Sequence, residues 1–435
     1  MFARVHHASQ GRPRTAWAVP LAATVMVATL PGRTHGLGLV TEPLMTDLRI
    51  DRVTFATLNF WATILGAAFC LPIGRLVDRC SASAVLAGCL AALGAVVVAL
   101  SAVRVDPMTV PLPAIGTLFR SESGGMMAVP AVLFLLVLLT RGLGQSGLSV
   151  VSLAILGRAA GARPGRAVGI YSCLVAIGFM GAFLGVKAAF EREDADWRGV
   201  WAGIGWCLVA CAVAAPWLVR LAGANATCGG PGADAAGSTL REALATPAFW
   251  AFGIATAFYG LVASGVSLFN QSLLAERGFD RSVFLTTTAM APLVGLTANL
   301  GGGWLAGLVS PGRIAGAGLA LQAGALAAFP LVRSIGGIYA YAAVMALAGG
   351  LLTVVFFGFW RQAFGAAHLG AVQSSAQALT VVASALGPVV LATGHHSAGS
   401  YVPVMLALAT VSAVLAAAVA LVPVPRPADL VEPSR

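Results

Sequence analysis

Two ionisable side chains lie in the middle of the first long apolar segment, residues 17–45. Arg33 and His35 follow the dipeptide Pro31-Gly32 there, so that helix-breaking residues coincide with the charges. A membrane tolerates a broken helix of this kind where it lines a cavity. Because guanidinium keeps its proton while imidazole titrates near neutral pH, Arg33 can bind a carboxylate and His35 can couple that binding to a proton. Alternatively, Arg33 pairs locally and His35 is a packed polar side chain.

A third candidate, Arg141, lies within the apolar segment 128–156. Gln145, Ser149 and Ser152 follow it at helical spacing, so that all four side chains share one polar face. An arginine within a membrane span is costly unless it faces a cavity or a partner. We therefore assign Arg141 and Gln145 to the predicted substrate site. The alternative is a structural arginine that donates hydrogen bonds to backbone carbonyl groups.

These side chains belong to a chain with the composition of a membrane protein. Of its 435 residues, 58% are hydrophobic and only 10% are charged, whereas about 25% of an average soluble domain is charged. At roughly 20 residues per bilayer span, the apolar material suffices for about a dozen helices. This composition excludes a soluble enzyme, a DNA-binding protein and a disulfide-framework protein.

Short polar breaks divide the chain into apolar segments and predict an all-α membrane protein with twelve transmembrane helices. The most polar stretch, residues 222–246, is rich in glycine, alanine and serine and indicates a flexible cytoplasmic linker. The predicted organisation is an N-terminal six-helix bundle (1–221), this linker and a C-terminal six-helix bundle (247–435). The predicted spans are residues 17–45, 53–77, 82–103, 128–156, 167–190, 199–221, 247–275, 283–309, 314–333, 338–361, 371–394 and 401–423.

Charge placement predicts how these helices are oriented. If the N-terminus, alternate loops and the C-terminus lie on one side, that side carries most of the arginines and a minority of the acids. The positive-inside rule makes this side cytoplasmic, so we expect a multi-pass protein of the cell (inner) membrane with both termini inside. Topology thus accounts for the formal net charge of +10, and no nucleic-acid partner is expected.

An internal repeat relates the two predicted bundles at an offset of 229 residues. Asp51-Arg52 aligns with Asp280-Arg281 and Gly74 aligns with Gly303, and further small and apolar residues match without a gap. Because six helices return the chain to the same side of the membrane, the two halves have parallel topology. Two six-helix bundles related by an axis along the membrane normal are a recurrent transporter architecture.

The break after the second span reads Gly74-Arg-Leu-Val-Asp78-Arg79. It resembles the G-x-L-x-D-R loop signature of the major facilitator superfamily and stands at the position that the signature has there. The resemblance implies the superfamily fold, alternating access and a conformational latch of Gly74, Asp78 and Arg79, whose charges bridge to a helix end. In the second half Gly307 stands where Asp78 does in the first, so we expect an asymmetric latch. The alternative is an ordinary solvated loop.

Two stretches, 38–44 and 249–279, are similar to the corresponding helices of bacterial monocarboxylate- and oxalate/formate-type carriers. Asn270 lies in the second of them. The chain departs from these carriers in the segment 371–394, which contains no lysine or arginine and offers Gln373 and Gln377 instead. We include Asn270, Gln373 and Gln377 in the predicted substrate site.

The cations within the spans decide which substrate is predicted. Arg33, Arg141 and Lys187 lie inside apolar segments, whereas no Asp or Glu lies near the middle of one. Uncompensated cations in a low-dielectric medium favour an anion. We therefore predict a secondary active transporter of a small organic anion, such as a monocarboxylate, that is coupled to protons or to a counter-anion.

Two other functions remain open from the sequence. A multidrug-type proton antiporter would export small hydrophobic compounds. A polytopic membrane enzyme would need clustered catalytic groups, but the chain has no H-E-x-x-H, no G-x-S-x-G and no pair of carboxylates within the spans. We expect no catalytic residue, no metal and no cofactor, and a monomer whose partners are the anionic substrate, the coupling ion and the lipid bilayer.

Overall fold

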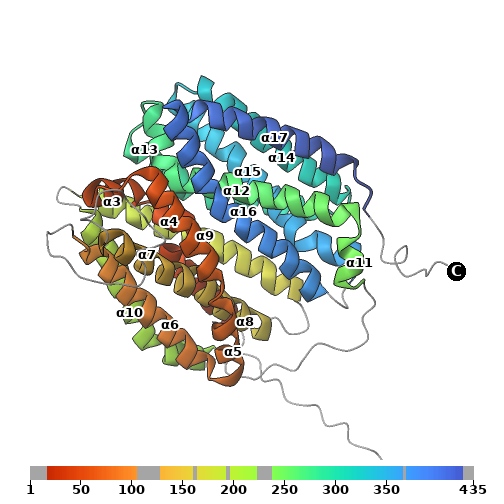
Figure 1. Ribbon diagram of the computed structural model, residues 1–435. Helices are drawn as coiled ribbons and strands as arrows, with labels where there is room; N and C mark the ends of the chain where they lie inside the picture. Colours follow the sequence, from red (N-terminus) through yellow and green to blue (C-terminus); the bar gives the residue numbers. More distant parts are fainter. Residues whose placement is uncertain are drawn as a thin grey trace, which may run out of the picture.

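The computed structural model describes residues 17–104, 128–159, 164–192, 196–222, 238–365 and 369–424. Within these ranges the regular elements are helices, which form two bundles side by side (Figure 1). Eleven helical segments there are long enough and apolar enough to cross a membrane. The all-α membrane architecture predicted from composition is thus confirmed.

The N-terminal bundle contains the first six predicted segments. Several of them consist of more than one helix, because the backbone is interrupted inside the segment. Its elements are α1 (Ala18–Val27), η2 (Leu30–Gly32), α2 (Thr34–Gly38), α3 (Thr41–Leu48), α4 (Arg52–Ala67), α5 (Cys70–Arg79), α6 (Ala82–Ala102), α7 (Ala128–Thr140), the π-helical η3 (Arg141–Leu148), α8 (Ser149–Ala159), α9 (Pro164–Phe190) and α10 (Trp197–Leu221).

The C-terminal bundle is built from longer, more continuous helices. A short helix precedes its six membrane segments. Its elements are α11 (Leu240–Leu244), α12 (Pro247–Glu276), α13 (Arg281–Leu305), α14 (Pro311–Ala328), η4 (Phe329–Leu331), α15 (Ile335–Phe364), α16 (Leu369–Ala398) and α17 (Val402–Leu421).

Both bundles begin their second segment with an aspartate at the helix N-cap. Asp51 accepts hydrogen bonds of 3.0 Å from the backbone N–H groups of Val53 and Thr54, which have no partner within α4, and so starts that helix. Asp280 occupies the corresponding position before α13. The two aspartates of the sequence repeat therefore stand at the same point of the two halves.

The first segment is broken where the sequence predicts a break. α1 ends at Val27, and the single turn of η2 contains Pro31, which has no N–H group to continue a helix. Arg33 then adopts an extended conformation (φ −92°, ψ 153°) before α2 begins at Thr34. The break places Arg33 between two short helices instead of inside a continuous one.

Part of the predicted linker is helical and packed against the C-terminal bundle. Thr239 and Glu242 form a capping box at the start of α11, and Ala243 is fully buried. The N–H group of Ser238 donates a hydrogen bond of 2.8 Å to the carbonyl oxygen of Phe364 at the end of α15. Residues 238–246 thus belong to the C-terminal bundle, whereas residues 223–237 of the linker lie outside the described ranges.

The two bundles contact each other through α2, α3, α4 and α9 on one side and α12, α13 and α16 on the other. Two hydrogen bonds between described residues cross the boundary: Lys187 Nζ donates to Thr286 Oγ1 (2.8 Å), and Arg281 Nη2 donates to the carbonyl oxygen of Leu39 (3.4 Å). All four residues lie near the end of the molecule opposite to the linker. We call this the far end, and the other the linker end.

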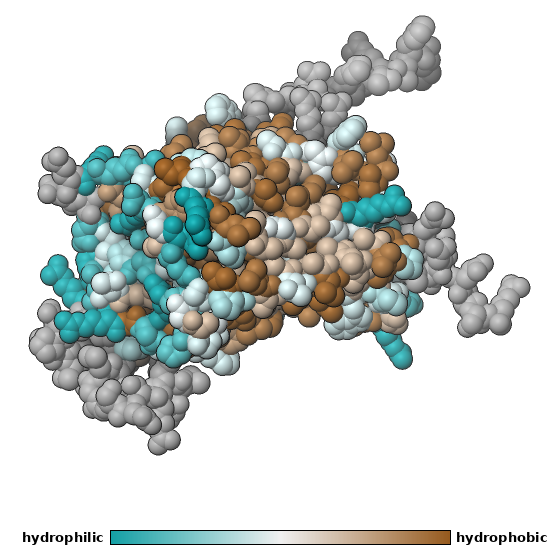
Figure 2. All heavy atoms as spheres, turned by 90° about the horizontal axis from the view of Figure 1, so that it is seen from above, coloured by the Kyte–Doolittle hydropathy of each residue, from teal (hydrophilic) through white to brown (hydrophobic). Residues whose placement is uncertain are grey.

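The surface of the molecule is that of a protein surrounded by lipid. In Figure 2, hydrophobic side chains cover the middle of the molecule, while hydrophilic ones gather at the end that carries α3. Large apolar side chains such as Trp206, Val213 and Trp217 of α10 are exposed. Such a surface would promote association in water, but in a bilayer it contacts the hydrocarbon chains.

Candidate functional site

A cavity of about 470 Å³ lies between the two bundles. The N-terminal half lines it with Arg33 and His35 at the break of the first segment and with side chains of α9. The C-terminal half lines it with side chains of α12, α13 and α15. Transporters built from two such bundles bind their substrates near the middle of the membrane, between the halves. This cavity is therefore the candidate functional site.

Arg33 forms part of the cavity wall. Its Nε donates a hydrogen bond of 2.6 Å to Thr29 Oγ1, and its Nη2 donates one of 3.3 Å to Ser149 Oγ on α8. The guanidinium carbon lies 5.6 Å from the ring centre of Phe179. In the described part of the chain, Nη1 has no hydrogen-bond partner and no carboxylate pairs with Arg33. A permanent positive charge with a free N–H edge therefore belongs to the cavity.

His35 follows on α2 and lies against two aromatic side chains. Its ring is edge-on to Phe179 and Phe183 of α9, with ring centres 6.0 and 5.9 Å away. It makes no hydrogen bond to the residues that the structure describes. Its ring nitrogens are therefore available to water, to a proton or to a ligand in the cavity.

Arg141 lies behind the cavity wall and is not part of it. Its side chain is only 2% exposed. It donates hydrogen bonds to Asn59 Oδ1 (2.5 Å), to the carbonyl oxygen of Gly32 (3.0 Å) and to Gln145 Oε1 (3.1 Å), and Thr34 Oγ1 accepts another at 3.1 Å. These acceptors come from α4, from the break of the first segment and from η3. This geometry favours the structural alternative for Arg141, because the guanidinium holds three segments together.

Glycines allow the broken part of the first segment to pack directly against the backbone of η3. A Cβ atom on Gly32 would overlap the backbone between Thr140 and Gln145, and one on Gly144 would overlap the backbone of Gly32. A π-helical segment is rare and widens the backbone locally. Here it brings Arg141 within hydrogen-bond distance of a carbonyl group in the neighbouring segment.

The other predicted substrate residues lie in different environments. Asn270 on α12 lines the cavity, whereas Gln373 and Gln377 on α16 do not. Gln145 is occupied as a hydrogen-bond acceptor of Arg141. The predicted residues that line the cavity are thus Arg33, His35 and Asn270.

The predicted latch lies on α5 at the linker end. A Cβ atom on Gly74 would meet nothing within 4 Å, so close packing does not require a glycine there in this conformation. α5 runs to Arg79, and the side chains of Asp78 and Arg79 lie outside the described part of the structure. Their latch function stays a prediction.

The cavity wall also contains polar residues that the sequence analysis does not identify. Besides serines and threonines, they are Tyr171 on α9, Tyr259 on α12, Asn299 on α13 and Tyr341 on α15. In the structure a Cβ atom on Gly349 would overlap the hydroxyl group of Tyr259, so this glycine makes room for the tyrosine. A lone tyrosine or asparagine in an apolar span does not by itself reveal which face of the helix meets the cavity.

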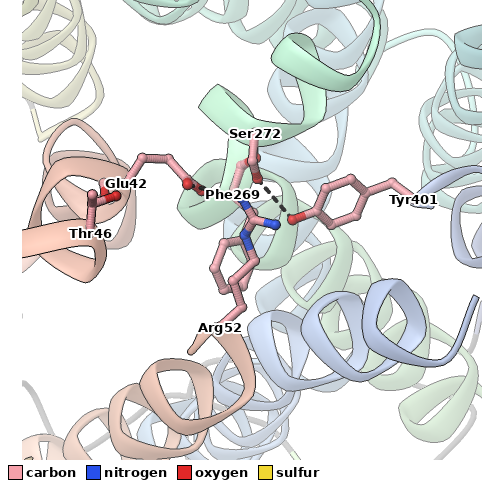
Figure 3. A network of polar contacts seen from close by, with 6 residues as sticks. All are labelled: Glu42, Thr46, Arg52, Phe269, Ser272 and Tyr401. Atoms are coloured by element: carbon pink, nitrogen blue, oxygen red, sulfur yellow. Dashed lines mark hydrogen bonds and ion pairs between the residues drawn. The ribbon is translucent and has the colours of Figure 1, made fainter. Parts of the chain in front are cut away.

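A second, smaller cavity of about 310 Å³ lies at the far end. Arg52 Nη2 on α4 donates to Glu42 Oε2 on α3 at 3.0 Å, and this ion pair lies next to the hydroxyl groups of Ser272 and Tyr401, which are 2.8 Å apart (Figure 3). Burial raises the pKa of Tyr401, so that its hydroxyl group stays protonated. Polar groups of both bundles thus meet at the far end.

The central cavity offers groups for binding. Its described lining contains neither Asp nor Glu. No group of three or more His, Cys, Asp and Glu side chains that could hold a metal ion occurs in the described ranges. What the wall presents is one permanent cation, one titratable ring and several neutral hydrogen-bonding groups.

Comparisons with known proteins are informative at the level of the fold. No protein-family model and no curated protein sequence matches the chain. Its structure is similar to that of a bacterial homolog to the human lysosomal transporter Spinster, in inward-facing occupied and unoccupied conformations; each has a TM-score of 0.69 and 17% identity over 94% of this chain and 96% of the other. The nucleoside transporter NupG has a TM-score of 0.66 and 15% identity over 94% of this chain and 98% of its own. The fold is that of the major facilitator superfamily.

Proposed function

We propose that this chain is a secondary active transporter that moves an organic anion by alternating access. Its fold is shared with solved transporters over nearly the whole chain. The candidate site lies at the boundary between the bundles, so that rocking of one bundle against the other exposes it first to one side and then to the other.

The observation that carries the anion assignment is the charge of Arg33. Its guanidinium lines the cavity without a carboxylate partner among the described residues, and no acid there could receive a cationic drug. In a low-dielectric site an uncompensated charge attracts a ligand of opposite sign. One permanent cation matches a substrate with one carboxylate, which bonds strongly to N–H groups of a guanidinium.

The contacts between the bundles support an inward-facing state. The hydrogen bonds that cross between described residues lie at the far end, as does the cluster around Glu42 and Arg52. The charge distribution predicts that the linker end is cytoplasmic. The site is then closed to the outside and accessible from the cytoplasm.

His35 is the group that we assign to proton coupling. It lines the same cavity as Arg33 and has no hydrogen bond to a described residue. An imidazole changes its charge within the physiological pH range. A proton on His35 adds a second positive charge beside a bound carboxylate, so that proton and anion favour each other's binding. Exchange for a counter-anion is the alternative, because Arg33 can bind either anion in turn.

Uptake into proteoliposomes tests the proposal. The purified chain is reconstituted and offered labelled monocarboxylates, neutral sugars and nucleosides, and cationic dyes, with and without a pH gradient. We expect uptake of carboxylates, its near loss in Arg33→Gln, and unchanged uptake in Arg333→Gln, which removes an exposed arginine that does not line the cavity. Transport of cationic dyes or neutral solutes, with no anion transported, would contradict it.

A further inference from the structure

The polar groups of the central cavity are distributed unequally between the two bundles. Arg33 and His35, its permanent cation and its imidazole, both come from the N-terminal half. Within the described lining, the polar side chains that come from the C-terminal half are all uncharged. A substrate with one carboxylate and an otherwise apolar body would bind to the charged groups of the N-terminal half. It would leave the polar side chains of the C-terminal half without a partner.

Two carboxamides of the C-terminal wall have no internal partner. Asn270 on α12 and Asn299 on α13 line the cavity, and neither side chain makes a hydrogen bond to a described residue. A carboxamide has two N–H donors and one oxygen acceptor. In a membrane span such groups are costly unless a partner satisfies them. Here the partner must come from the cavity, as water or as substrate.

Tyr341 on α15 provides a third group of this kind. The residue is only 8% exposed and packs against Phe329, with ring centres 5.2 Å apart. Its hydroxyl group is buried and has no hydrogen-bond partner in the described structure, although the residue lines the cavity. A buried hydroxyl group without a partner destabilises the folded protein. A phenylalanine would avoid this cost and fill almost the same volume.

The threonines of the same wall differ from these three residues. Thr287 and Thr288 donate to the carbonyl oxygen of Phe284 at 2.9 and 2.8 Å, and Thr353 donates to the carbonyl oxygen of Gly349 at 2.7 Å. Their donors are satisfied by their own helices. Asn270, Asn299 and Tyr341 therefore have donors left for a ligand, as do Ser267 and Tyr259 on α12, whose hydroxyl groups also make no hydrogen bond to a described residue.

We infer that the transported anion is a carboxylate whose body carries hydroxyl or amide groups, with its charge held by Arg33 and its neutral polar groups held by Asn270, Asn299 and Tyr341. This inference rests on the proposed function. The cavity volume of about 470 Å³ lies in the range of sites for larger organic ligands, roughly 300–1,000 Å³. It leaves room for a polar body that a bare short-chain acid does not have.

Such a substrate spans the boundary between the bundles. Its carboxylate belongs to the N-terminal wall and its hydroxyl groups to the C-terminal wall, so that binding energy is available for drawing the two halves together. A site built to bond a hydroxyl group also rejects an analogue without it, because the groups of the site are then left buried and unpaired.

The first test combines stability with binding in one variant. Tyr341→Phe removes the unpartnered hydroxyl group and should leave the melting temperature of the purified full-length chain unchanged or raise it. The same variant should bind the hydroxylated acid quinate at least tenfold more weakly. Tyr339→Phe, two residues away on the same helix and outside the cavity lining, is the matched control and should bind as the parent does. A Tyr341→Phe protein that loses stability and keeps its affinity would overturn the role of Tyr341.

The second test compares matched ligands by calorimetry. Quinate is paired with cyclohexanecarboxylate, and gluconate with hexanoate, so that each pair differs in its hydroxyl groups. We expect the hydroxylated member to bind at least tenfold more tightly, and Asn270→Leu to reduce that ratio. Equal affinities within both pairs, or binding of the bare acids alone, would overturn the inference while the anion proposal stands. If the methyl ester of quinate binds as well as quinate, the anion proposal fails instead.

Discussion

Glu42 and Arg52 form an ion pair of 3.0 Å within the N-terminal bundle, and it lies against the hydrogen bond between Ser272 and Tyr401 in the C-terminal bundle (Figure 3). The four side chains come from α3, α4, α12 and the start of α17. All of them line the small far-end cavity. The ion pair thus contributes to the contact that closes the far end in this conformation.

Arg52→Gln should loosen this closure. The pair is partly exposed, with 32% of the arginine and 19% of the glutamate side chain accessible, so the expected effect is that of a surface pair, about 0.2–1 kcal/mol, or up to about fivefold in the population of the opened state. Hydrogen–deuterium exchange of residues 398–402 in the opposite bundle should rise accordingly. Asp47→Asn, which removes the Asp47–Arg198 pair inside the N-terminal bundle, should leave exchange there unchanged. The double variant Glu42→Arg/Arg52→Glu should restore slow exchange, and a failure to do so would show that the charges are not paired in the closed state.

Arg33 should determine substrate affinity. Arg33→Gln removes the permanent cation of the cavity, and the expected loss is about 10- to 150-fold, the equivalent of one charged hydrogen bond of roughly 1.5–3 kcal/mol. Arg33→Lys should keep part of the affinity, because the charge remains while the planar group that fits a carboxylate is lost. Calorimetry on stably folded protein measures both effects. Undiminished binding by Arg33→Gln would make Arg33 a structural residue.

His35 should set the pH dependence of transport. Replacement by glutamine keeps the polarity and removes the titration, so the profile of uptake between pH 5.5 and pH 8 should become flat, with a smaller change in binding at one fixed pH. The other charged groups nearby, Arg33 and Arg141, do not titrate in this range. His395→Gln at the far end is the comparison variant. If the pH dependence of uptake persists in His35→Gln and disappears in His395→Gln, proton coupling depends on the far end and not on His35.

Arg141 should behave as a structural residue. Arg141→Met leaves Asn59 and the carbonyl oxygen of Gly32 without their donor, at a cost of about 1–3 kcal/mol for each buried group. The melting temperature and the yield of folded protein should therefore fall, in contrast to Arg33→Gln. Because Asn59 is a partner of Arg141, the double variant Arg141→Met/Asn59→Leu should lose less stability than the two single variants together. Normal stability of Arg141→Met with abolished binding would place Arg141 in the substrate site.

The fold was predictable because its signals are local and repeated. Apolar length defined the spans, and Pro31-Gly32 marked the break of the first segment, which η2 and the extended Arg33 confirm. Part of the linker was harder to predict, since glycine and alanine dominate it. The capping box of Thr239 and Glu242 was the local signal for α11.

The candidate site was only partly predictable, since helical spacing shows which residues share a face but not what that face meets. Arg141 and Gln145 do share a face, yet they meet the neighbouring segment and each other. The stripe of Gln373 and Gln377 lies on a helix that does not line the cavity. Asn299 and Tyr341 line it because of how α13 and α15 are placed, which depends on tertiary packing.

The one-sided charge of the central cavity has an electrical consequence. Arg33 is part of the protein, so the empty cavity carries its positive charge, while a bound carboxylate cancels it. The membrane potential is worth about 2.3 kcal/mol per elementary charge and 100 mV. If the carboxylate binds without a proton on His35, the potential therefore acts mainly on the step in which the unloaded protein changes its orientation. A proton on His35 leaves the loaded cavity with one positive charge, and the potential then acts on both steps. A negative cell interior would therefore favour the orientation of the unoccupied carrier in which its cavity is open to the cytoplasm.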